Sequence, residues 1–216
     1  MKEAGINLNF APVVDLNINP TNPVIGSLKR SFSADPTIVI NHASKFIEAH
    51  KSHKIINVIK HFPGHGSSTD DSHLLITDVT DTWKNIEIKP YVQLIDSGMV
   101  DAIMTAHVFN RNFDPMFPAT LSKIIINDWL RKGLKFNGVI ISDDMQMQSI
   151  LSVYSFDIAI QKAIEAGVDI ILTCNNSQHD KGVVERMINI IKTLVSEDRI
   201  NESYNRIMRL KKKWLY

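Results

Sequence analysis

The chain has 216 residues, of which 44% are hydrophobic and 22% are charged, a composition typical of a globular protein with one large core. Its 24 Lys and Arg nearly balance its 23 Asp and Glu, so no overall charge favours nucleic acid or an anionic membrane as a partner. The single cysteine, Cys174, excludes an intramolecular disulfide framework, and no apolar stretch approaches the roughly 20 residues of a membrane span.

Five short apolar runs, rich in isoleucine and valine, predict buried parallel strands. Each run is too short for a typical helix and is almost continuously apolar, as strands covered on both faces are. In chain order they occupy residues 6–14, 55–59, 101–108, 138–142 and 168–173.

Stretches with helical spacing lie between these runs. The first begins at Asp35, an N-cap residue followed by Pro36, and places Val39, Ala43, Phe46 and Ile47 on one face. The second predicted helix covers about 82–96. The third begins at a Ser122 cap and ends at Gly133, and the fourth covers 155–166 and ends before Gly167. Two more helices are predicted near the end of the chain, at 183–196 and 202–214.

This alternation of strand and helix predicts an α/β fold of right-handed crossovers, either an open doubly wound sheet or a (β/α)8 barrel. No glycine-rich dinucleotide-binding or phosphate-binding loop occurs, which favours the barrel. A complete barrel needs eight strands and about 250 residues. We therefore expect a single domain over residues 1–216 with a partial, TIM-barrel-like fold.

The segment "KHFPGHGSSTDDSH", residues 60–73, concentrates histidine and aspartate after the second predicted strand. His61, His65 and His73, with Asp70 and Asp71, are side chains that zinc accepts as ligands. However, Pro63 and Gly64 separate the first two histidines, and no His-Glu-x-x-His pattern is present. We expect no metal here, while a metal-dependent hydrolase and a polar loop without chemistry stay as alternatives.

The segment "GVIISDDMQM" ends the fourth predicted strand with Asp143 and Asp144. Adjacent strand residues point to opposite sides, so one of the two is expected to face the barrel axis, where a carboxylate can act as a nucleophile. Paired with a proton donor from another loop, it would suffice for two-step glycoside hydrolysis. The alternative is a pair of helix N-cap residues.

These segments, together with "NFAPVVDLN", "VIGSLKRSFSADP", "IMTAHVFN" and "AIEAGVDIIL", resemble glycoside hydrolase family 3, most closely its bacterial β-N-acetylhexosaminidase branch. The resemblance implies that Asp143 is the nucleophile that forms a covalent glycosyl-enzyme, that His73 is the general acid/base and that Asp71 is the partner of His73. Lys60, which is expected to lower the pKa of Asp143 together with Arg30, resembles a residue that binds sugar hydroxyls.

His61 and Arg30 likewise resemble sugar-contacting residues, and Asp15 is expected to reach the same pocket, with a loop cap as the alternative. His107 either lines that pocket or is packed at the end of its strand. The element Asp71-Ser72-His73 after "KHFPGHG" distinguishes the hexosaminidase branch from the glucosidases. A β-glucosidase or β-xylosidase would need another acid/base.

The resemblance implies hydrolysis of terminal β-linked N-acetylglucosamine from peptidoglycan fragments or chitooligosaccharides, without a cofactor. The opening residues, "MKEAGINLNF", lack a charged region followed by an apolar one, so we expect no signal peptide in this chain. The expected location is the cytoplasm, or the periplasm or exterior if an upstream signal exists. A non-catalytic partial barrel is the remaining alternative.

Overall fold

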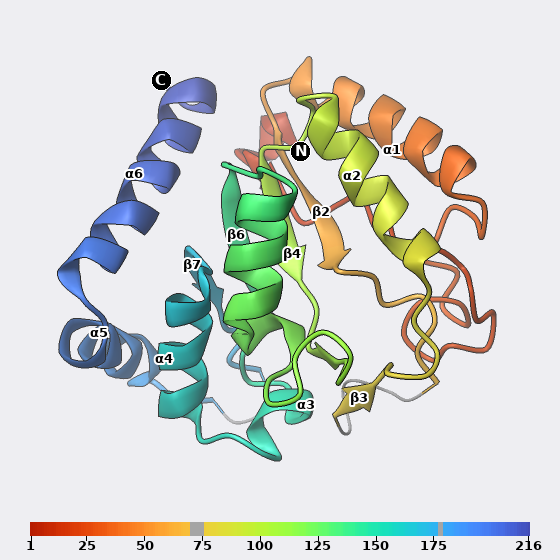
Figure 1. Ribbon diagram of the computed structural model, residues 1–216. Coiled ribbons are helices and arrows are strands. Elements are labelled where there is room, and N and C mark those ends of the chain that lie inside the picture. Colours follow the sequence, from red (N-terminus) through yellow and green to blue (C-terminus); the bar gives the residue numbers. More distant parts are fainter. Residues whose placement is uncertain (70–75, 177–178) are drawn as a thin grey trace.

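The computed structural model describes residues 1–69, 76–176 and 179–216, and its centre is a curled sheet of five parallel strands (Figure 1). The strand order is β1-β2-β4-β6-β7, and every neighbouring pair is parallel. Each predicted apolar run contributes one strand to this sheet, so the predicted parallel sheet is confirmed. The bounds are β1 (Leu8–Asn9), β2 (Ile56–Phe62), β4 (Ala102–Thr105), β6 (Val139–Asp144) and β7 (Ile170–Leu172).

Some strand bounds differ from the predicted ones. The first run forms only two ladder residues, because Pro12 has no backbone N–H to donate, and Val13 adds an isolated bridge to Lys60. β2 continues through Phe62, which places Lys60 and His61 on the strand itself rather than in the following loop. The third run divides, since β5 (Val108–Phe109) leaves the main sheet and pairs with β3 (Thr77–Asp78).

The helices begin and end largely where their caps predict. Asp35 accepts a hydrogen bond from the Thr37 N–H, and Ser122 Oγ accepts one from the Ile125 N–H. The predicted helix over 82–96 is instead a 3-10 turn followed by an α-helix, because Pro90 favours the first turn of a new helix. The bounds are η1 (Lys2–Ala4), α1 (Pro36–Lys51), η2 (Asn85–Ile88), α2 (Lys89–Asp96), η3 (Ala119–Leu121), the π-type helix η4 (Ile124–Gly133), α3 (Gln148–Leu151), α4 (Phe156–Ala166), α5 (Val183–Leu194) and α6 (Glu197–Trp214).

The sheet is covered on both faces, as its apolar strands require. Ile59, Ile103 and Ile140 belong to a large cluster that includes side chains of α1, α2, η4 and α4. On the opposite face, alternate residues such as Val58, Met104 and Ile141 form a second cluster with Ile207, Leu210 and Trp214 of α6. The period-two alternation along each strand therefore divides the core into an outer layer and an inner layer.

Helix α6 is fastened to the amino ends of the strands. The Asp169 carboxylate, just before β7, accepts hydrogen bonds from Arg131, Arg199 and Arg206. Lys213 Nζ also donates to Asp101, just before β4, at 2.6 Å. The carboxyl ends of the strands lie at the opposite edge of the sheet.

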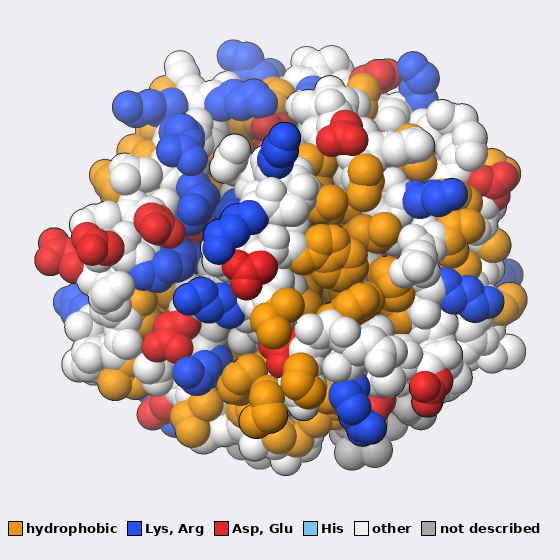
Figure 2. Space-filling view, viewed as in Figure 1, with side chains coloured by type: hydrophobic (Ala, Val, Ile, Leu, Met, Phe, Trp, Pro, Cys, Tyr) orange, Lys and Arg blue, Asp and Glu red, His pale blue; other side chains and the backbone are white. Residues whose placement is uncertain are grey.

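Cationic side chains gather over α6 and its surroundings (Figure 2). The last turn of α6 carries Lys211, Lys212 and Lys213, which complement the negative end of the helix macrodipole. None of the described helices combines the length and the apolar character needed to cross a bilayer.

Candidate active site

Two of the predicted site residues meet at the carboxyl edge of the sheet. His61, near the end of β2, and Asp143, near the end of β6, come from strands that flank β4. His61 Nε2 lies 3.9 Å from Asp143 Oδ2. Both the (β/α)8 barrel and the open doubly wound sheet have their active sites at the carboxyl edge.

Asp15 lies behind His61 and holds its imidazole ring. Its carboxylate accepts hydrogen bonds from the His61 N–H at 3.1 Å and from the His65 N–H at 2.9 Å. Because a carboxylate only accepts, His61 Nδ1, 2.7 Å from Asp15 Oδ2, is the donor, which leaves Nε2 facing Asp143. Burial alone would raise the pKa of Asp15, but the charge and hydrogen bonds of His61 outweigh it, so that pKa lies below its ordinary value. Asp15 is 1% exposed and therefore reaches the pocket only through His61.

The pKa of Asp143 is also lowered. Burial acts to raise it, but electrostatic interactions with His61 and His107, the hydrogen bond from the Asp144 N–H and a smaller contribution from Lys60 outweigh that effect. The carboxyl group is consequently ionised at neutral pH, as a nucleophile must be. The expected effect of Lys60 is confirmed, although the histidines contribute more, and the expected effect of Arg30 stays a prediction. The pKa of Lys60 itself is lowered by burial and by the charge of Arg30.

Arg30 joins this group from the segment before α1. Its Nη1 donates to the Val24 carbonyl at 3.1 Å, and its Nη2 lies 3.5 Å from His61 Nε2. Arg30, Lys60, His61 and Asp143 are thus brought to one edge of the sheet by segments more than 100 residues apart in sequence.

The two adjacent aspartates point to different partners. Asp144 Oδ1 accepts from the Gln146 N–H at 3.0 Å and from the Cys174 N–H at 3.1 Å, which ties the end of β6 to the segment after β7. The N-cap alternative is wrong, because α3 begins only at Gln148 and Met147 is its N-cap residue. Asp143 is therefore the member of the pair that faces His61.

His107 supports the end of β6 from within the core. Its Nε2 donates to the Asp144 carbonyl at 3.0 Å, and its Nδ1 lies 2.9 Å from Thr120 Oγ1. Burial lowers the pKa of His107, which disfavours the charged form. Both ring nitrogens have protein partners, so His107 is packed at the end of its strand rather than lining the sugar pocket.

Glu87, on η2, is a buried carboxyl group that the sequence pattern does not reveal. Its Oε2 accepts from the Gly66 N–H and its Oε1 from the Lys84 N–H, both at 3.1 Å. Burial raises the pKa of Glu87. From the same side, Trp83 Nε1 donates to the Pro63 carbonyl at 3.3 Å. A lone glutamate between isoleucines carries no signal of this role, which depends on contacts made across 21 residues.

The segment that Glu87 holds has no space for a side chain at Gly66. A Cβ built there would lie 1.6 Å from the Leu16 carbonyl oxygen. Asn22 Nδ2 holds the same segment by donating to the His65 carbonyl at 2.7 Å. Hydrogen bonds to Asn22 and Glu87 therefore hold this segment, and its backbone lies close to the Leu16 carbonyl.

The predicted acid/base pair, Asp71 and His73, lies outside the described residues, as does Asp70. Their roles stay predictions from the resemblance. Among the residues that the structure does describe, no group of three or more His, Cys, Asp or Glu side chains is placed to hold a metal ion. In that part of the histidine-rich segment, the ring of His61 bonds to Asp15 and His65 Nδ1 lies 2.8 Å from Ser68 Oγ.

Known proteins share this architecture. Residues 1–210 match the Glycosyl hydrolase family 3 N terminal domain. A Beta-hexosaminidase of Tolumonas auensis is 41% identical over 174 residues, which are 79% of this chain and 51% of that protein. The structure of a glycoside hydrolase family 3 beta-N-acetylglucosaminidase from Paenibacillus sp. str. FPU-7 superposes with a TM-score of 0.89 at 34% identity and covers 98% of this chain and 41% of that one.

A beta-glucoside phosphorylase is also similar, with a TM-score of 0.83 at 27% identity over 97% of this chain and 39% of that one. The chain spans about half the length of the curated relatives it matches.

Proposed function

The chain belongs to glycosyl hydrolase family 3, and we propose that it is a retaining glycosidase that hydrolyses terminal β-linked N-acetylglucosamine. The substrates would be peptidoglycan fragments or chitooligosaccharides. The names of the hexosaminidase and N-acetylglucosaminidase relatives support the choice of sugar. The observation that carries the proposal is the ionised Asp143 carboxylate beside His61 at the carboxyl edge of the sheet.

In the first step, an Asp143 oxygen attacks the anomeric carbon of the sugar. The bond from that carbon to the glycosidic oxygen breaks, its electron pair passes to the oxygen, and His73 protonates the departing alcohol. The product of this step is a covalent glycosyl ester on Asp143. The low pKa of Asp143 supports this role, because it keeps the carboxylate free of a proton at neutral pH.

In the second step, water attacks the anomeric carbon and releases Asp143. His73, now unprotonated, accepts the proton of the water molecule, so one water is consumed and each group returns to its starting form. Asp71 would orient His73, as a carboxylate orients the histidine of a hydrolytic triad. A histidine suits both steps because its ordinary pKa, about 6.5, lies near neutrality.

Lys60, His61 and Arg30 would bind the hydroxyls of the sugar on which Asp143 acts. The Asp15 carboxylate supports this arrangement from behind, since its bond to His61 Nδ1 fixes the direction of Nε2. Asp15 is thus assigned a positioning role through His61 rather than direct contact with the sugar.

A second candidate function is phosphorolysis, favoured by the similarity to a beta-glucoside phosphorylase. In that reaction phosphate, in place of water, would attack the glycosyl ester on Asp143. A histidine acid/base would repel the phosphate anion less than a glutamate would.

The test is release of nitrophenol from its β-N-acetylglucosaminide by the purified chain, with the β-glucoside as the comparison substrate. We expect activity on the acetamido sugar, a loss of at least about a thousandfold in Asp143→Asn and about a hundredfold or more in His73→Ala. Parallel reactions with phosphate and with a chelator separate hydrolysis from phosphorolysis and from metal-dependent chemistry.

Three outcomes would contradict the proposal. Faster turnover of the glucoside would favour a glucosidase, and loss of activity with the chelator would favour a metal-dependent hydrolase. No release by a chain that unfolds cooperatively would mean that the site is incomplete in this chain and that the activity belongs to a longer protein, whereas non-cooperative unfolding would favour the non-catalytic alternative.

A further inference from the structure

The balanced overall charge of the chain hides an uneven distribution. Residues 206–216, called here the basic segment, contain five of the 24 Lys and Arg and no Asp or Glu. The other 205 residues contain 19 cationic and 23 anionic side chains, so they carry a net charge of −4 against +5 for the basic segment. The basic segment forms the end of α6, at the amino ends of the strands (Figure 1).

The folded core uses only part of this positive charge. Arg206 and Lys213 pair with buried carboxylates at 3.0 and 2.6 Å. The other three cations are exposed, and within the described residues their side chains make no hydrogen bond or ion pair: Arg209, Lys211 and Lys212. The negative end of a helix macrodipole amounts to only about half an elementary charge, so it accounts for at most one of them.

Lys51, the last residue of α1, adds a further cation to this edge of the sheet. Its Nζ lies 3.6 Å from Asp101 Oδ2, and Asp101 also accepts the hydrogen bond from Lys213. Both ammonium groups lie over the Trp214 ring, with Lys51 Nζ 5.7 Å and Lys213 Nζ 5.3 Å from its centroid. One carboxylate and one indole ring therefore hold two cations together, which leaves a net positive charge at the surface.

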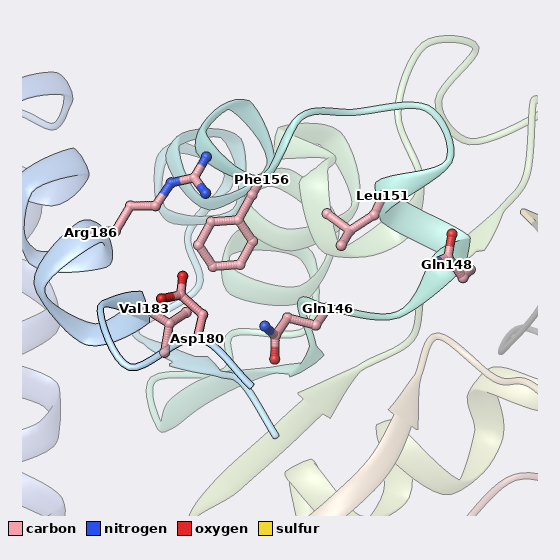
Figure 3. Close-up of a pocket in the computed structure, with 7 residues that line it drawn as sticks. All are labelled: Gln146, Gln148, Leu151, Phe156, Asp180, Val183 and Arg186. Carbon is pink, nitrogen blue, oxygen red and sulfur yellow. The ribbon is translucent and has the colours of Figure 1, made fainter. Parts of the chain in front are cut away.

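An arginine near the opposite edge of the sheet is balanced, in contrast. Arg186 lines a pocket that also contains the Asp180 carboxylate (Figure 3). Its Nε donates to Asp157 Oδ1 at 2.7 Å. This arginine therefore contributes no excess charge, unlike the cations that gather over α6 (Figure 2).

Large apolar side chains are exposed next to the excess cations. Leu215 and Tyr216 follow Trp214 directly and are 39% and 89% exposed. Met1, which lines a pocket with His50 near the end of α1, is 47% exposed. Lysines flanked by exposed aromatic and aliphatic side chains suit the surface of an anionic bilayer, where cations meet the lipid phosphates and aromatic rings lie at the headgroup level. A nucleic acid would use the cations but would give an exposed leucine no apolar surroundings.

We propose that the amino edge of the sheet, with the basic segment at its centre, binds the surface of an anionic membrane. The Lys and Arg side chains would contact lipid phosphates, and Leu215 and Tyr216 would enter the headgroup region, with no helix crossing the bilayer. His61 and Asp143 lie at the opposite edge of the sheet, so the bound chain would present its candidate active site away from the lipid. The inference goes beyond the proposed glycosidase function and does not depend on it.

The test is sedimentation of the full chain with vesicles of equal parts phosphatidylcholine and phosphatidylglycerol, and with vesicles of phosphatidylcholine alone. We expect binding to the anionic vesicles only, and weaker binding as salt is added, because salt screens exposed charges. The double variant Lys211→Gln, Lys212→Gln should bind about 30-fold more weakly, about fivefold for each lysine at the membrane surface. The matched control, Lys45→Gln, Lys181→Gln, removes two exposed lysines on α1 and before α5 and should bind as the wild-type chain does.

A second double variant separates a membrane from a nucleic acid as the partner. Leu215→Ser, Tyr216→Ser keeps every charge and should weaken vesicle binding about tenfold, because it removes apolar surface from the headgroup region. Tighter binding of the wild-type chain to a DNA oligonucleotide than to anionic vesicles, unaffected by this variant, would overturn the inference in favour of a nucleic acid. No binding to anionic vesicles, equal binding to neutral ones, or an equal loss in the control pair of lysines would also overturn it.

Discussion

Replacing Asp169 by alanine tests how α6 is held to the sheet. The Asp169 side chain is 0% exposed, and its carboxylate is surrounded by Arg131, Arg199 and Arg206, whose side chains are 8%, 13% and 19% exposed. It also accepts from the Ile140 N–H at 3.0 Å. Removing the carboxylate would leave three largely buried guanidinium groups around a cavity.

The expected loss follows from the cost of a buried charge without its partner. Breaking a buried ion pair by removing one member typically costs about 3–5 kcal/mol. Burial already lowers the pKa of Arg131 to about 10, which shows that this cation is poorly solvated even with Asp169 present. For a chain of this size, such a loss corresponds to a decrease in Tm of roughly 6–20 °C.

The assay is urea and thermal unfolding followed by circular dichroism at neutral pH. The control is Glu48→Ala, which removes an exposed ion pair with Lys45 and should change the free energy of unfolding by less than about 1 kcal/mol. Asp169→Asn keeps the shape of the side chain and should also destabilise, because its amide would direct a donor at a guanidinium group. If Asp169→Ala matched Glu48→Ala, the reasoning would be refuted, and the arginines would have to be satisfied by solvent.

Three further predictions concern the site and its support. Asp15→Asn should lower kcat/KM on the aryl glycoside by on the order of 10- to 100-fold, because the amide no longer fixes the His61 tautomer. Gly66→Ala should lower the free energy of unfolding, measured in urea, by about 1–3 kcal/mol, because the added Cβ would overlap the Leu16 carbonyl. Burial lowers the pKa of His65 to about 4, so only the unfolded chain binds its proton between pH 4 and about 6.5. Stability should therefore fall as pH decreases through that window, by about 3 kcal/mol from this group, as measured by urea midpoints across pH.

Each of these predictions has its own control. If Asp15→Asn kept both the stability and the kcat/KM of the wild-type chain, Asp15 would have no positioning role. Gly133→Ala, where an added Cβ would meet its nearest atoms at ordinary contact distances of 3.4 and 3.5 Å, should be tolerated, and equal losses at Gly66 and Gly133 would contradict the steric argument. His65→Gln should flatten the pH dependence between pH 4 and 6.5, and a slope equal to that of the wild-type chain would exclude His65 as its source.

Much of the framework follows from local sequence patterns. Continuous apolar runs identify the five strands because a strand buried on both faces needs apolar residues at successive positions. Asp35 and Ser122 mark helix starts because a side-chain oxygen there accepts from a backbone N–H that has no intrahelical partner. These signals act over only a few residues, so they are readable without the fold.

The exact ends of the strands required the tertiary structure. Lys60 and His61 lie on β2 rather than after it, because the ladder to β4 extends through Phe62 to Thr105. Whether a polar residue ends a strand or continues it depends on the neighbouring strand, which the local pattern does not contain.

What the sequence by itself determined is the five strands of the main sheet and the longer helices, and the resemblance adds a prediction of which residues carry the catalytic chemistry. Only the tertiary structure decided that Asp143 rather than Asp144 faces His61, that Asp15 lies behind the imidazole, and that Glu87 anchors the neighbouring backbone. The physical reason is that each arrangement depends on direction and distance between residues that are 21 to 82 positions apart in sequence. Composition and periodicity specify which side chains are present, whereas close packing of the folded sheet and its helices sets where each one points.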